Sequence, residues 1–234
     1  MKALVILVAL VGVAHANDFP PGAAYLHEEL TLLDHTSDAG DNSEIRQIGL
    51  AGFRLHGFIR CECMPIAYHA GLDLALGAVL GRHGGFAYEV GFLPIGVGFF
   101  LGRSSWLTIG TGIVGSGATG SLDDAAQWPV DVDLELELTK RIRVIAWGRM
   151  AWDTAAPSRV GGSPTIPFAD EVSGMIGIRI GHHYEDYGFP TGNGPYLGFS
   201  YREMLGTKFI GITLGYSIDM ASPPENDRRR HEPV

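Results

Sequence analysis

The sequence predicts an all-β fold, an antiparallel up-and-down transmembrane β-barrel of about eight to ten strands. Three observations indicate it. Apolar side chains alternate with small or charged ones over much of the chain. Hydrophobic residues make up 46 % of the sequence, yet past residue 13 no apolar run approaches the roughly 18 residues that a membrane helix needs. One long hairpin has a fully apolar face and an ion-paired face.

That hairpin spans residues 128–152, with strands at 128–138 and 142–152 and a turn at 139–141. Facing residues of an antiparallel pair keep a constant sum, here 280. The sum places Leu138 opposite Ile142 and, at the far end, Trp128 opposite Trp152. Each strand is close to the roughly 9–11 residues that cross a bilayer, so we expect the two tryptophans at a membrane interface.

Other stretches alternate in the same way, and the chemistry of their second face favours a barrel. That face is mostly glycine and serine with single charges, whereas a soluble sandwich covers its wet face with lysine, glutamate and threonine. Alternation alone does not separate the two, so a soluble secreted β-sandwich stays an alternative. The stretches are 68–80, 106–114, 171–181, 196–204 and 208–220.

The strand count depends on three ambiguous segments. The apolar parity changes near Gly52 within 45–58 and across Pro94 within 86–101, and either a β-bulge or a turn would explain each change. Residues 24–33 fit a short helix or a first strand equally well. With 86–101 as a single bulged strand and a strand at 24–33 the count is ten, and with a helix at 24–33 and a turn at Pro94 it is again ten. Other combinations give nine or eleven.

The connections give part of the topology. Residues 139–141 and 205–207 predict tight turns, whereas 116–127, 153–170 and 184–195 predict long loops. Long loops usually face outward from the cell. If the turn at Thr139 is periplasmic, the first two long loops obey this rule and the third does not.

The ends of the chain predict export and a tail. Residues 1–16 have the charged start, short apolar run and small-residue site of a cleaved signal peptide. An acidic segment, 17–44, precedes the predicted barrel at 45–220, and 221–234 is expected to be a disordered tail. Arg228 to Arg230 could touch anionic lipid or a periplasmic partner. The net charge of −9 argues against nucleic-acid binding.

The last predicted strand carries a more specific pattern. Thr213, Gly215, Ile218 and Met220 occupy the frame polar-x-Gly-x-x-aromatic-x-aromatic, although Ile218 and Met220 replace the aromatics and fourteen residues follow. Over residues 45–220 the sequence thus resembles the small bacterial outer-membrane β-barrels, the broad class of the OmpA-, OmpX- and OmpW-like families. The resemblance implies a Gram-negative cell envelope, location in the outer membrane and recognition by its insertion machinery.

A set of charged residues is predicted to lie inside the barrel. We expect them to be the ion-paired filling of a narrow lumen, with Glu137 facing Arg143 and Asp131 facing Arg149, because buried charges must be paired. A proton or ion path is the alternative. The set is Asp131, Asp133, Glu135, Glu137, Arg143, Arg149, Arg179 and Arg202.

Two further motifs invite a chemical interpretation. Cys61 and Cys63 could form a disulfide in an oxidising compartment, stay separate thiols, or bind a soft metal with His56 or Met64. His182 and His183 are adjacent, so on a strand they point to opposite faces and cannot chelate jointly. We therefore expect no metal and no cofactor.

The expected function is that of a non-enzymatic outer-membrane barrel with a structural, adhesive or envelope-complex role exerted through its loops and tail. Its partners would be outer-membrane lipid and, through the tail, periplasmic or envelope proteins. One alternative is a narrow channel for small solutes. The other is an outer-membrane enzyme acting on lipid, which needs a nucleophile and a base at one rim; the candidates are His69, Ser104, Ser105, His182 and His183.

Overall fold

The structure is a computed structural model that describes residues 22–36, 45–60, 66–81, 84–101, 105–118, 122–153, 171–186, 189–204 and 207–222. All the regular elements of these residues are β-strands. They are β1 (Gly22–His35), β2 (Ile45–Arg60), β3 (Ile66–Gly81), β4 (Gly85–Phe100), β5 (Trp106–Ala118), β6 (Leu122–Thr139), β7 (Ile142–Asp153), β8 (Glu171–Ile180), β9 (His182–Asp186), β10 (Phe189–Met204) and β11 (Thr207–Ser222).

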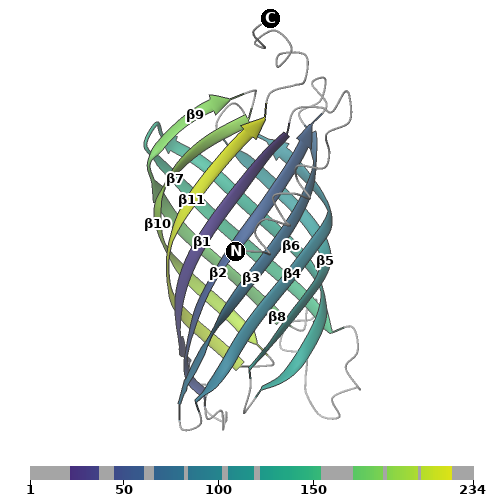
Figure 1. Cartoon of the computed structure of the whole chain (residues 1–234), viewed down its shortest axis with the longest axis vertical. Helices are drawn as coiled ribbons and strands as arrows, with labels where there is room; N and C mark the ends of the chain where they lie inside the picture. The colour runs from purple at the N-terminus through teal and green to yellow at the C-terminus, as the bar shows by residue number, and fades with distance from the viewer. Residues whose placement is uncertain are drawn as a thin grey trace, which may run out of the picture.

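The strands form one closed antiparallel barrel (Figure 1). Consecutive strands pair from β1 to β8 and from β9 to β11, and β11 closes the sheet by pairing with both β10 and β1. β8 and β9 both pair with β10, over 196–201 and 189–193, and are therefore two parts of one barrel stave interrupted at Gly181. The barrel has ten staves, which confirms the predicted up-and-down topology at the upper end of the expected range.

The register of the β6–β7 hairpin is confirmed over most of its length. Facing residues add to 280 from Trp128 and Trp152 up to Glu137 and Arg143, and the two indole rings lie 5.4 Å apart. The register shifts next to the turn, where Ile142 pairs with Thr139, so the expected pairing with Leu138 is wrong. There Thr139 Oγ1 accepts hydrogen bonds from the backbone N–H groups of Arg141 and Ile142, at 3.2 and 3.1 Å.

The acidic N-terminal segment contributes a full stave rather than a helix. β1 pairs with β2 on one side and β11 on the other, so the barrel runs from residue 22 to residue 222 rather than from 45 to 220. Because the number of staves is even, Gly22 and Ser222 lie at the same end, called here the termini end; it is at the top of Figure 1, where the arrow of β11 points. The expected signal peptide and all but the start of the expected tail lie outside the described residues.

The two parity changes have different causes. β2 pairs with β1 in an unbroken register, so the bulge or turn predicted near Gly52 is wrong. The apolar parity changes there because Ile48 and Leu50 are apolar yet face the interior. β4 does contain the predicted bulge. Its register with β3 and with β5 shifts around Leu93 and Pro94, where Leu93 is buried.

Two of the three predicted long loops are wrong. Residues 116–118 pair with 122–125 at the end of the β5–β6 hairpin, and residues 182–186 of β9 pair with 189–193 of β10. The turn-forming residues in these two segments do not end the strands, because backbone pairing continues across them. The connection after β9 is therefore short. It lies at the termini end, on the same side as the Thr139 turn, so it does not contradict the rule that long loops face outward.

The exterior of the barrel is apolar. Large hydrophobic side chains are exposed on all ten staves, including Leu30, Ile59, Leu76, Phe92, Ile113, Leu138, Met150, Ile176, Phe199 and Ile212. Charged and polar side chains alternate with them and point inward. In the described part of the chain, no helix is long and apolar enough to cross a membrane.

Gly215 has a packing role in this barrel. It faces Tyr196 across the β10–β11 pair, and the Tyr196 ring lies directly over it, so that an added Cβ would come 2.2 Å from the ring. The hydroxyl of Tyr196 continues past Gly215 to donate a hydrogen bond to the backbone carbonyl of Glu28 in β1, at 3.2 Å. The glycine of the C-terminal pattern therefore lets one ring tie together three staves at the closure of the barrel.

We predict that Gly215→Val destabilises the barrel by about 1–3 kcal/mol, since the new side chain must displace the Tyr196 ring. The measurement is the urea midpoint of unfolding in lipid, followed by loss of heat-modifiable gel mobility. Gly148→Val is the matched control, because nothing lies within 4 Å of a Cβ at Gly148. Equal midpoints for the two variants would contradict the packing role.

Candidate functional site: the polar interior

The charged residues predicted for the lumen lie on the inward faces of β6, β7, β8 and β10. Seven of the eight are buried, and Glu137, near the Thr139 turn, is partly exposed. They are joined by residues that were not predicted to belong to this set. These are Glu29, Arg54, Asp73, Glu89 and Asp219, together with the histidines His27, His56 and His69.

The first ion-pair group is centred on Arg149. Its Nε lies 2.7 Å from Asp131 Oδ2, its Nη1 lies 2.7 Å from Glu89 Oε1, and its Nη2 contacts Asp73. A single guanidinium group thus serves carboxylates from three other staves, β6, β4 and β3. Charge-assisted contacts of this kind are the stronger class of hydrogen bond.

Two more arginines complete this group. Arg54 Nη2 lies 2.9 Å from Asp131 Oδ1 and 3.0 Å from Asp133 Oδ1. Arg202 Nη1 lies 2.7 Å from Glu89 Oε2. The "Arg149 cluster" denotes the set Glu29, Arg54, Asp73, Glu89, Asp131, Asp133, Arg149 and Arg202.

These ion pairs span the lumen. Arg54 projects from β2 and its partner Asp131 from β6, while Arg202 projects from β10 and its partner Glu89 from β4. In a ring of ten staves, β2 and β6 or β4 and β10 lie on nearly opposite walls. The contacts therefore cross the interior from wall to wall, and the side chains that make them occupy its cross-section.

Trp147 packs between two of the arginines. The guanidinium carbons of Arg54 and Arg202 each lie 4.3 Å from the centroid of its ring. Such cation–π contacts are worth about 2 kcal/mol or more when they are shielded from water. Trp147 is itself buried, so an aromatic ring fills the space between the two arginines.

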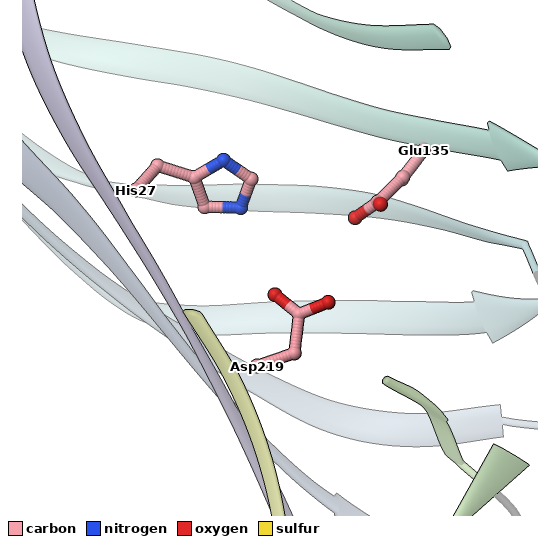
Figure 2. Close-up of side chains that lie close together, drawn as sticks. All are labelled: His27, Glu135 and Asp219. Carbon is pink, nitrogen blue, oxygen red and sulfur yellow. The ribbon is translucent and has the colours of Figure 1, made fainter. Parts of the chain in front are cut away.

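A second ion-pair group lies between β6, β8 and β11 (Figure 2). Glu135, Asp219 and His27 converge there, with one ligand atom of each within 4.8 Å of the others, a spacing that a metal ion could use. Arg179 nevertheless pairs with both carboxylates, at 2.9 Å to Asp219 Oδ2, and Arg143 Nη1 lies 3.1 Å from Glu135 Oε1. Two guanidinium groups already neutralise the carboxylates, so the cluster does not favour a divalent cation.

Aromatic side chains fill the interior towards the termini end. Tyr25, Phe58 and Trp106 pack within 5.1–5.4 Å of one another, and the Tyr25 hydroxyl donates a 2.6 Å hydrogen bond to the backbone carbonyl of Pro190. Arg60 lies over the rings of Phe100 and Phe189, 5.0 Å from each centroid. Towards the opposite end, an apolar cluster covers the wall formed by β11 and β1 to β4; its members are Leu33, Ile48, Leu50, Ala75, Val79, Ala87 and Phe209.

Small cavities remain between these groups. Two cavities in the interior, one beside Glu89 and Arg202 and one beside His27 and Trp147, have volumes of about 10 and 20 Å³. Each is large enough for about one water molecule. Ion pairs and aromatic side chains occupy the interior, and the remaining cavities can hold single water molecules.

Among the candidates for catalysis that the structure describes, His69, Ser105 and His182, no hydrogen bond joins one to another. His69 is buried and stacks on His56, with 2.9 Å between His69 Nε2 and His56 Nδ1, whereas His182 is exposed at the start of β9. Ser105 accepts a hydrogen bond from the backbone N–H of Glu137. Cys61, Cys63, Ser104 and the side chain of His183 lie outside the described residues.

Comparisons with known proteins do not identify a family for this chain. No family model and no curated protein matches the sequence. Among solved structures, the chain is similar to the translocator domain of the autotransporter NalP from Neisseria meningitidis, with 8 % identity and a TM-score of 0.39, over 93 % of this chain and 94 % of that one. It is also similar to the NanC porin, with 6 % identity and a TM-score of 0.43, over 85 % of this chain and 98 % of that one. A third similar structure is the β domain of the Bordetella autotransporter BrkA, with 11 % identity and a TM-score of 0.37, over 84 % of this chain and 98 % of that one. At such identities and TM-scores we infer neither family nor function from them.

Proposed function

We propose that this protein is a non-conducting, non-enzymatic barrel of the bacterial outer membrane, which acts as a structural or envelope-complex component. The observation that carries the proposal is the set of buried ion pairs between opposite walls, Arg54 with Asp131 and Arg202 with Glu89. Ion pairs that cross the lumen in this way obstruct the passage of solutes. Its remaining surfaces for function are the exterior, the connections and the segments that flank the barrel.

The exterior supports the membrane location. A soluble protein rarely exposes a contiguous apolar patch of more than a few hundred Å², whereas this barrel exposes large apolar side chains on every stave. Side chains that alternate between an apolar outside and a polar inside are the pattern of barrels in the outer membrane. Trp128 and Trp152 form one interfacial pair towards the end opposite the Thr139 turn.

The connections support an orientation. None of the connections between strands at the termini end, 61–65, 101–105, 140–141 and 187–188, exceeds five residues. The opposite end has three short connections, 82–84, 119–121 and 205–206, and also the two longest, 36–44 and 154–170. Short turns face the periplasm and longer loops face outward in barrels of this class. We therefore place the termini end, and the segment that follows β11, in the periplasm.

The expected result in planar lipid bilayers is that the folded protein gives no discrete conductance steps, because the wall-to-wall ion pairs and the aromatic cluster block the lumen. Folding is checked in the same preparation by heat-modifiable gel mobility, and a general diffusion porin in the same bilayer is the positive control. Reproducible conductance steps from the folded protein would instead favour the narrow channel.

A further inference from the structure

Glu28 is an ionisable residue on the apolar outside of the barrel. On β1, buried residues such as Tyr25, His27 and Thr31 alternate with outward ones, and Glu28 belongs to the outward set and is exposed. Its outward neighbours on the same strand are Leu26 and Leu30. It is a charge in the middle of a hydrocarbon surface.

The residues across from Glu28 are also apolar or aromatic. It faces Phe53 of β2 and Tyr216 of β11 in the two ladders. Its backbone carbonyl accepts the hydrogen bond of Tyr196, but within the described strands no side chain donates to its carboxylate. The carboxylate therefore has no partner on its own barrel wall.

Glu28 lies at mid-depth. It lies six positions after Gly22 and seven before His35, the two ends of β1. Six residues of a strand tilted by roughly 40° rise about 15 Å, and the apolar band of such barrels is about 25 Å tall. If the barrel is embedded as proposed above, the carboxyl group lies near the centre of the bilayer, where ionisable groups are costly and typically have a functional partner.

We propose that the face around Glu28 is a lateral docking site for another membrane-embedded protein, which presents a cationic side chain to this carboxylate at mid-depth. Charge complementarity defines the occupant. An unpaired charge in hydrocarbon is strongly disfavoured, whereas a hydrogen-bonded ion pair satisfies both partners. The docking face consists of Glu28 and the side chains around it, Leu26, Leu30, Phe53 and Tyr216.

Neither lipid nor a second copy of the chain provides this cation. Cationic lipid groups lie in the headgroup region and not at the bilayer centre. On the outward faces of the described strands, the residues that can carry a positive charge are Lys208 and His182. Lys208 lies beside the start of β11, at one end of the barrel, and the exposed His182 lies at the start of β9, in the part of its stave nearer the termini end. A symmetric pair of copies would bring together two carboxylates instead of opposite charges.

The inference rests on the proposed membrane location, and the experiment tests the two separately. A photo-crosslinking amino acid replaces Leu30, which is 58 % exposed, in the full-length protein of the cells that naturally produce it. Ile109 on β5, which is 45 % exposed and lies four staves away, receives the same label as the control. Fractionation shows first whether both labelled proteins reside in the outer membrane; failure there would refute the location itself.

We expect the Leu30 label to capture a membrane protein through a segment that contains a lysine, arginine or histidine. Glu28→Leu should lower the yield at least about tenfold, whereas Glu28→Gln should retain part of it because the amide oxygen still accepts a hydrogen bond. Glu28→Arg, combined with an acidic residue in place of the partner's cation, should restore the yield.

Several outcomes would overturn the docking site while leaving the membrane location intact. They are a yield unaffected by Glu28→Leu, equal capture from Ile109, products with lipid only, capture of a second copy, or a captured segment without a cationic residue.

Discussion

Replacing Arg149 by methionine should destabilise the folded barrel by about 3–5 kcal/mol, the cost typical of removing one partner from a buried ion pair. The guanidinium group serves Asp73, Glu89 and Asp131, all of which are buried. Methionine keeps an unbranched apolar stem in place of the arginine stem but has no guanidinium group, so the carboxylates lose their shared counter-ion. The measurement is the urea midpoint of unfolding in lipid vesicles.

The control for this prediction is Arg141→Met, at an exposed position in the Thr139 turn, which should change the stability by less than about 0.5 kcal/mol. Adding Asp131→Asn to Arg149→Met should recover part of the loss, since one fewer carboxylate is left without its counter-ion. If Arg149→Met is as mild as Arg141→Met, the Arg149 cluster is hydrated and the lumen is open to water, contrary to the proposed blocked interior.

Regular alternation and a short turn made β6 and β7 predictable. A ladder with period two has only two possible faces, so one turn fixes the register of every pair from Glu137 with Arg143 to Trp128 with Trp152. The prediction failed only at Leu138, where the turn's own hydrogen bonds to Thr139 shift the register by one residue.

The rule that apolar residues face outward fails where the barrel interior is itself apolar. Ile48 and Leu50 are buried inside with Leu33 and Phe209 towards one end of the barrel, so the parity of β2 looked broken although its backbone is regular. The same mixture concealed Arg54, which faces inward on that strand. Around Pro94 the same kind of signal does mark a bulge, and the sequence alone does not distinguish the two cases.

The partners of the luminal charges depend on closure of the whole barrel. Glu137 and Asp131 could be matched to arginines on the adjacent strand because cross-strand neighbours follow from the register. Arg202 with Glu89 pairs across the lumen at a separation of 113 residues, and that contact exists only once the number of staves and their stagger are set. Local patterns therefore predicted a charged interior but not its wall-to-wall pairing.

The membrane location leads to the prediction with the other large effect, a dependence of stability on depth. Ile176 and Leu138 are each 60 % exposed on the outside of the barrel. Ile176 lies within the stave formed by β8 and β9, whereas Leu138 is next to the last residue of β6, beside the turn. Ile176→Arg should destabilise the barrel by about 2–4 kcal/mol in a lipid bilayer and Leu138→Arg by only about 0–1 kcal/mol, because a cation is most costly at the bilayer midplane.

Both variants introduce an arginine at positions of equal exposure, so depth in the membrane is the main difference between them. Urea unfolding in vesicles measures both, with Gly148→Val as a further variant that adds an apolar group to the same outer surface. A soluble barrel whose exterior faces water would tolerate arginine equally well at both positions, since exposed substitutions there cost little. Equal stabilities for Ile176→Arg and Leu138→Arg would therefore refute the membrane location, and with it the reason to expect a cationic partner at Glu28.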